Sequence, residues 1–115
     1  MVVGGHLDFL YPLPGPIAAG TYVIQVNADY GSGVGSVLEA DLDDLSDAGA
    51  DDHVDTERYT IGADAGFAEG LLLDVSRQLP VVDAGCGDTL RLRLSMPAGP
   101  DGGYFAGLQP QLTIP

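Results

Sequence analysis

The aspartate-rich stretch DLDDLSDAGADDHVD, residues 41–55, holds the side chains with the clearest potential for chemistry. Clustered carboxylates are ligands that Ca²⁺ prefers, and the EF-hand loop requires oxygen ligands at alternate positions, a central glycine and a distal glutamate. Frames that start at Asp43 or Asp47 do not fit that pattern. Two alternatives stay open, a solvated acidic loop or a looser calcium site between strands. The candidate ligands of that site are Asp43, Asp47, Asp51, Asp52 and Asp55.

Side chains that could act as nucleophiles or bases lack the sequence context of a catalytic site. The spacing of His6 and His53 gives no support for a shared metal, and the serines lack the nucleophile-elbow pattern. Cys86 is the single cysteine, which excludes an internal disulfide and a multi-cysteine zinc cluster. We therefore expect a non-enzymatic protein with no catalytic residues and, calcium apart, no cofactor.

Aromatic rings are the second group of interest, because exposed rings form platforms for sugars. The chain has no tryptophan, and the period-two pattern places Tyr22, Tyr30 and Tyr59 on the core face of strands. Tyr104 and Phe105, in the glycine-rich PDGGYFAG, are then the candidates for an exposed pair. Such a pair favours a carbohydrate-binding or adhesion-type module, or else a subunit contact.

Two arginines form the one cationic stripe that the sequence predicts. Arg91 and Arg93 alternate with leucines in TLRLRLSM, residues 89–96, so both face outward from a strand. They could meet the acidic stretch of a neighbouring subunit, or pair across strands with acids of the same chain. Both alternatives stay open.

The charge balance excludes two classes of partner. The chain contains fourteen Asp, three Glu, four Arg and no Lys, and its formal net charge is −13. Nucleic acids and anionic membranes are bound by clustered lysine and arginine, so we expect neither as a partner. Dense aspartate without lysine is typical of proteins in multimolar salt, where charge repulsion is screened. A GC-rich genome is the other explanation.

Hydrophobic periodicity predicts an all-β chain. Alternating apolar and polar residues recur throughout, helical periodicity is missing, and Gly, Pro and Asp crowd the gaps. With 115 residues, we expect a single antiparallel β-sandwich of seven to eight strands, jelly-roll or immunoglobulin-like. We expect 21–30 and 36–43 to pair as a hairpin across GSGVG. The other predicted strands are 6–11, 58–63, 70–76, 89–96 and two short pieces around Pro110.

The two ends of the chain are apolar and rich in proline. LDFLYPLPGPI and LQPQLTIP lie in segments 1–17 and 104–115, which we expect to be terminal arms that make assembly contacts. The N-terminus lacks the basic region of a signal peptide, and no apolar run is long enough to span a membrane as a helix.

In architecture and composition the whole chain resembles small β-sandwich accessory proteins of tailed-virus particles, such as capsid decoration, turret and tail components. The resemblance implies a structural protein located in the virion, with an extracellular location as the alternative. It implies capsid or tail proteins as partners and a homo-oligomer, most simply a trimer. The expected interface residues are Phe9, Leu10, Tyr11, Arg91, Arg93, Tyr104, Phe105, Leu112 and Ile114.

Overall fold

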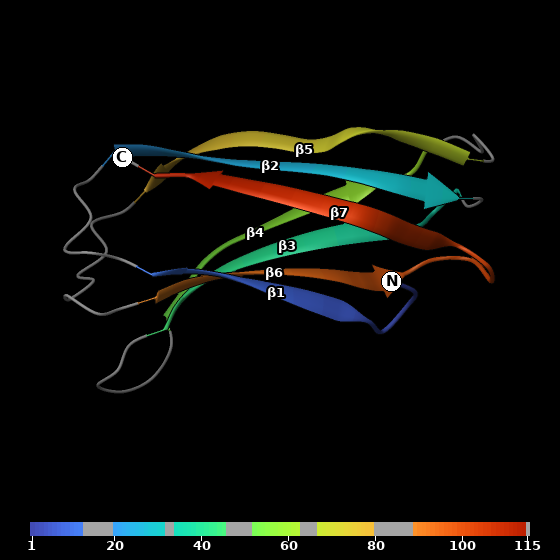
Figure 1. Cartoon of the computed structure of the whole chain (residues 1–115), viewed down its shortest axis with the longest axis horizontal. Coiled ribbons are helices and arrows are strands. Elements are labelled where there is room, and N and C mark those ends of the chain that lie inside the picture. Colours follow the sequence, from blue (N-terminus) through green and yellow to red (C-terminus); the bar gives the residue numbers. More distant parts are fainter. Residues whose placement is uncertain (13–19, 32–33, 46–51, 63–66, 80–88, 115) are drawn as a thin grey trace.

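Seven antiparallel strands pack as two sheets in the structure, a computed structural model that describes residues 1–12, 20–31, 34–45, 52–62, 67–79 and 89–114. One sheet has the order β1-β6-β3-β4 and the other β5-β2-β7 (Figure 1). None of the described residues is helical, so the predicted antiparallel β-sandwich is confirmed. The strands are β1 (His6–Pro12), β2 (Gly20–Gly31), β3 (Val37–Leu45), β4 (Asp52–Thr60), β5 (Phe67–Leu79), β6 (Thr89–Ala98) and β7 (Tyr104–Thr113).

The core follows from period-two alternation. Successive side chains of a strand point to opposite faces of its sheet. In β6 the apolar side chains from Leu90 to Met96 are fully buried and alternate with half-exposed polar residues. β3 shows the same alternation, and Ile24 and Val26 of β2 are fully buried in the same core cluster. Burial of these faces against each other is the main apolar contribution to folding.

The strand pairing is nested, as in a long hairpin folded over on itself. β3 pairs with β4, β2 with β5 and β1 with β6, and β7 joins the free edge of β2. An immunoglobulin domain also pairs its second strand with its fifth and its third with its sixth. It keeps its first strand beside the second, its fourth beside the fifth and its last beside the sixth. Here β1 lies beside β6, β4 beside β3 and β7 beside β2, and β1 and β7 are edge strands.

The predicted hairpin of 21–30 with 36–43 is wrong, because β2 and β3 lie in opposite sheets. Alternation specifies which face of a strand is buried, but it does not specify the partner strand. The Gly35 N–H donates to the Ile61 carbonyl at 2.8 Å, and the Ile61 N–H donates to Ser36 at 2.9 Å. Residues 35 and 36 therefore already hydrogen-bond on the side of the sheet that contains β3 and β4.

Three further boundaries differ from expectation. The predicted arms, 1–17 and 104–115, contribute β1 and β7, which are integral edge strands; residues 13–17 lie outside the described residues. The closing segment is one strand rather than two pieces, and Pro110 is tolerated because an edge strand has one unpaired side. The aspartate-rich stretch is not a continuous loop, since it completes β3 and begins β4. Residues 46–51 lie outside the described residues.

Residues 1–5 join the two sheets beside β1. Met1 exchanges two backbone hydrogen bonds with Phe105 of β7, at 2.8 and 3.0 Å. The Gly4 N–H donates to the Met96 carbonyl of β6 at 2.9 Å. This segment therefore crosses from an edge of one sheet to an edge of the other.

Candidate functional site

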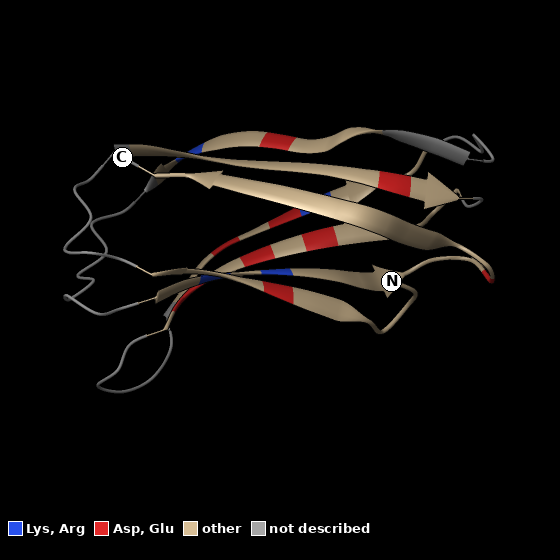
Figure 2. Ribbon diagram, viewed as in Figure 1, with Lys and Arg blue, Asp and Glu red and all other residues tan. Residues whose placement is uncertain are grey.

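The outer face of the four-stranded sheet carries rows of polar side chains that run across the strands. Directly opposed residues on neighbouring strands lie on one face, so the register defines the rows. One row is His6, Ser95, Glu39 and Arg58; the next is Asp8, Arg93, Asp41 and Thr56; the third is Leu10, Arg91, Asp43 and His53. Figure 2 shows the alternation of acidic and basic residues over β1, β6 and β3.

The arginines of this face pair within the chain. Arg93 makes two hydrogen bonds to the Asp8 carboxylate, at 2.7 and 3.0 Å, and the Arg93 guanidinium lowers the pKa of Asp8. Arg91 donates to Asp43 at 3.1 Å. The outward orientation predicted for Arg91 and Arg93 is confirmed, and of the two open alternatives the structure has the cross-strand pairing. Within this pairing, Arg91 Nε is buried without a hydrogen-bond partner.

His53 lies at the centre of a hydrogen-bonded chain on the same face. Its Nδ1 is 2.7 Å from Asp43 Oδ1, and its Nε2 is 2.8 Å from the hydroxyl of Thr56. Thr56 in turn donates its one proton to Asp41 at 2.6 Å. His53 and Thr56 therefore link the carboxylates of Asp43 and Asp41 along the outer face. The sequence did not reveal this chain, because it depends on the register of β3 with β4.

Of the five aspartates proposed as calcium ligands, the structure describes the side chains of two, Asp43 and Asp55, and these face opposite sides of the sheet. Asp43 faces outward toward Arg91, whereas Asp55 faces inward and accepts a hydrogen bond from Tyr22. Asp47 and Asp51 lie outside the described residues, and only the backbone of Asp52, at the start of β4, is described. The described part of the chain contains no cluster of three His, Cys, Asp or Glu placed to hold a metal ion.

One long side of the sandwich, between β4 and β5, is closed by polar contacts. The Tyr22 hydroxyl of β2 donates to Asp55 of β4 at 2.5 Å, and Arg77 of β5 lies 2.8 Å from Glu57 of β4. Inward-pointing charges on an edge strand oppose the addition of another chain. The β4 edge is therefore protected.

The opposite side, between β1 and β7, is apolar. Its inward-facing side chains are only partly buried, because the three-stranded sheet has no strand opposite β1. Leu7 is 47% exposed although it lies opposite the fully buried Leu94. Figure 2 shows β7 without a charged residue along its length. We call this the β1–β7 side; its partly buried residues are Phe9, Tyr11, Leu108, Pro110, Leu112 and Ile114.

Several predicted interface residues lie on this side, and one prediction is wrong. Phe9, Tyr11, Leu112 and Ile114 are half-buried there, and Leu10 is 60% exposed on the outer face of β1. Phe105, by contrast, is fully buried in the core, where its ring centroid is 6.5 Å from that of Tyr30. The exposed Tyr104–Phe105 pair does not form, because consecutive residues of a strand face opposite ways.

Exposed apolar side chains continue into the N-terminal segment. Val2 is 62% exposed and Val3 48% exposed, and with Tyr104 they line a hollow of about 500 Å³ closed by residues 99–103. Among the described residues, six large hydrophobic side chains are exposed, and four of them lie between Val2 and Leu10. The exposed apolar surface is therefore concentrated at and next to β1.

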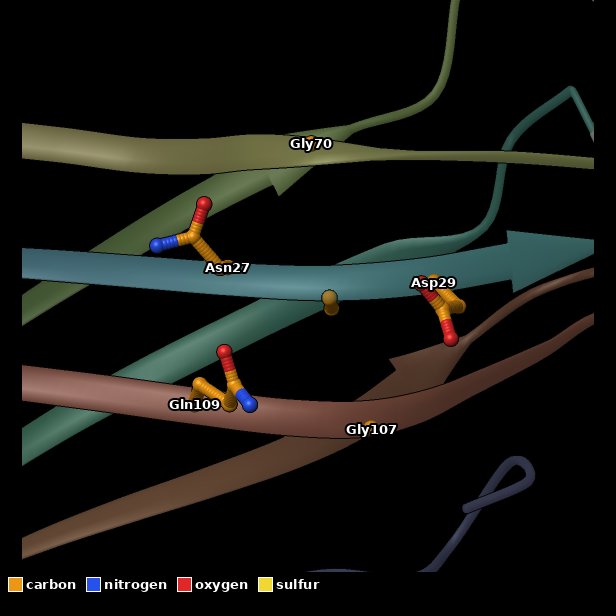
Figure 3. A pocket seen from close by; sticks show the side chains of 6 residues that line it. Asn27, Asp29, Gly70, Gly107 and Gln109 are labelled. Atoms are coloured by element: carbon orange, nitrogen blue, oxygen red, sulfur yellow. The ribbon is translucent and has the colours of Figure 1, made fainter.

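A second hollow, of about 510 Å³, lies on the outer face of the three-stranded sheet. Two register shifts in β2 create it, one between Val26 and Asn27 against β5 and one between Asn27 and Asp29 against β7. Figure 3 shows Asn27 directed toward β5, Gln109 toward β2 and Asp29 toward Gly107. The lining residues are Asn27, Ala28, Asp29, Gly70, Gly107 and Gln109.

Comparison of the chain with models of known families, with curated proteins and with solved structures gave no match. No helix in the described ranges is long and apolar enough to cross a membrane.

Proposed function

We propose that this protein is a non-enzymatic structural module that works by protein–protein assembly through its β1–β7 side. The contrast between the two long sides of the sandwich carries the proposal. The β4–β5 side is closed by Tyr22–Asp55 and Arg77–Glu57, whereas the β1–β7 side has half-exposed apolar residues. Apolar area left in water is an unfavourable term that a contact would remove.

The distribution of charge supports the same side. Two copies of a chain with a net charge of −13 repel each other, so a contact is favoured where charge density is lowest. β7 has no charged residue, and the one acidic residue of β1, Asp8, is paired with Arg93. Multimolar salt would screen the remaining repulsion and strengthen the contact.

The biological setting that we propose is a tailed-virus particle, in which the protein is a capsid decoration, turret or tail component. Support for this setting comes from the architecture, the composition and the contact surface taken together. The expected form is a closed homo-oligomer, most simply a trimer, that binds capsid or tail proteins.

The test is the absolute mass in solution, measured by light scattering after size exclusion at low salt, in multimolar NaCl and with Ca²⁺. A discrete closed oligomer, stronger at high salt, is the expected result. A monomer under all three conditions would overturn the proposed self-assembly. An oligomer that appears only with Ca²⁺ would mean that a metal site, and not the β1–β7 side, drives assembly.

A further inference from the structure

We propose that the hollow lined by Asn27, Asp29 and Gln109 binds a neutral, hydroxyl-rich ligand, namely a sugar residue of a glycan. This site does not depend on the assembly proposal, because its lining residues face outward from the three-stranded sheet and none of them is among the partly buried residues that define the β1–β7 side. Its volume of about 510 Å³ lies within the range of roughly 300–1,000 Å³ that small-molecule sites occupy.

The backbone builds the hollow by two departures from regular pairing. The register shift against β5 places Leu73 opposite Val26 and Leu71 opposite Asn27, so Leu72 is the extra residue. The shift against β7 lies beside Gly107, which has a φ of +57°. A Cβ at Gly107 would lie 3.1 Å from Asp29 Oδ2, so glycine keeps the carboxylate in place and the floor open.

The polar side chains of the hollow are available to a ligand. On the other sheet, the outward-facing Asp8, Asp41, Asp43 and Glu39 each hydrogen-bond to a neighbouring side chain. Among the residues the structure describes, the side chains of Asn27, Asp29 and Gln109 have no such partner. Two amides and a carboxylate around one hollow supply both donors and acceptors for hydrogen bonds.

The chemistry of these groups selects the ligand class. An anion would be repelled by Asp29 and by the net charge of −13. A divalent cation prefers several carboxylates, and Asp29 is the one acid among the lining residues. Neutral hydroxyl groups donate to a carboxylate and both donate to and accept from amides, so a sugar ring satisfies all three side chains at once.

An aromatic ring lies on the same face next to the hollow. Tyr104 is opposite Gly31 in the register, and a Cβ at Gly31 would collide with the Tyr104 ring, so the ring covers this glycine. Asp29 and Ala106 form the adjacent row, roughly 7 Å along the strands. Tyr104 can therefore contact the apolar face of a second sugar unit while the first occupies the hollow.

The test is a titration of the isotope-labelled protein with neutral sugars, followed by amide chemical shifts. The probes are glucose, galactose, mannose and their disaccharides, with glucuronic acid as the charged counterpart. We expect saturable shifts that centre on residues 27–29, 70 and 106–109 for at least one neutral sugar. Asn27→Ala and Gln109→Ala should each weaken the binding of that sugar about tenfold, the usual effect of a lost hydrogen bond with incomplete compensation. Asp29→Asn, which keeps the shape, should weaken it as well.

Gln111→Ala is the matched control, because Gln111 is exposed on the same face of β7 and does not line the hollow. It should bind like the unchanged protein. The proposal is overturned if no neutral sugar gives saturable shifts, or if glucuronic acid binds more tightly than glucose. Equal weakening by Gln109→Ala and Gln111→Ala, with native-like spectra for both, would also overturn it.

Discussion

The hydroxyl of Tyr22 in one sheet donates a 2.5 Å hydrogen bond to the carboxylate of Asp55 in the other. The Tyr22 side chain is 2% exposed, so this bond forms where water has little access. Burial and the hydrogen bond with Asp55 raise the pKa of Tyr22 well above its ordinary value. The contact closes the β4–β5 side. On the β1–β7 side the described residues make backbone hydrogen bonds through residues 1–5 but no such side-chain contact between the sheets, which makes that side the candidate for assembly.

Replacing Tyr22 by Phe should lower the free energy of unfolding by about 1.5–3 kcal/mol, the usual range for a hydrogen bond to a charged group. Urea unfolding of the variant measures this. Tyr59→Phe is the control, since Tyr59 also packs against the core and no described residue hydrogen-bonds to its hydroxyl. Equal losses in both variants would mean that the contact with Asp55 adds nothing.

Phe105→Ala should destabilise the fold by about 3–5 kcal/mol, because a fully buried ring leaves a cavity. Tyr104→Ala, which removes a half-buried ring from the outer face, should cost much less. Denaturant midpoints of the two variants give the comparison. Were Phe105 an exposed contact residue, as the sequence predicted, its removal would change oligomer mass and leave monomer stability nearly unchanged.

Stability should rise as the pH falls from 7 toward about 5 and should decline below about pH 4. Burial raises the pKa of Asp41, and burial together with Asp55 raises that of Glu57, so the folded state binds these protons more tightly than the unfolded state. The pKa of Asp8 is lowered by its hydrogen bond with Arg93, and that of Glu39 by its hydrogen bonds with Asp41 and Arg58. Their stabilisation is lost as the pH falls below the ordinary values of 3.8 and 4.5.

Urea midpoints measured across this pH range provide the test. Asp41→Asn should flatten the rise in stability between pH 7 and about pH 5, because it removes one of the two carboxyl groups whose pKa is raised. A midpoint that falls steadily as the pH drops from 7 would contradict the assignment of Asp41 and Glu57.

The sequence predicted the strands well where alternation is uninterrupted. Leu90, Leu92, Leu94 and Met96 were expected to face the core, and all four are fully buried. Prediction failed where the backbone departs from regularity. Period-two alternation over the predicted strand 70–76 would place Leu71 on the same face as Leu73, but the bulge at Leu72 turns Leu71 outward, to 48% exposure.

Strand partners and the hollow could not be predicted, for a common physical reason. Both depend on register between segments far apart in the chain, and local alternation carries no information about it. Asn27 and Gln109 are directly opposed across β2 and β7 although eighty-two positions separate them. The placement of β1 beside β6 and of β7 beside β2, which leaves the apolar side open, likewise depends on pairing between segments far apart in the chain.

The most direct test of the β1–β7 side is the mass of charge-addition variants in multimolar NaCl at equal protein concentration. Leu7→Asp and Leu10→Asp place a carboxylate on β1, whereas Val34→Asp places one on a 54% exposed residue outside β1 and β7, in the turn before β3. Each variant adds one negative charge, so the overall electrostatic repulsion between copies is the same in all three variants. We predict that both β1 variants are monomeric while Val34→Asp keeps the oligomer of the unchanged protein. An oligomer retained by both β1 variants, or lost equally in all three, would contradict the account.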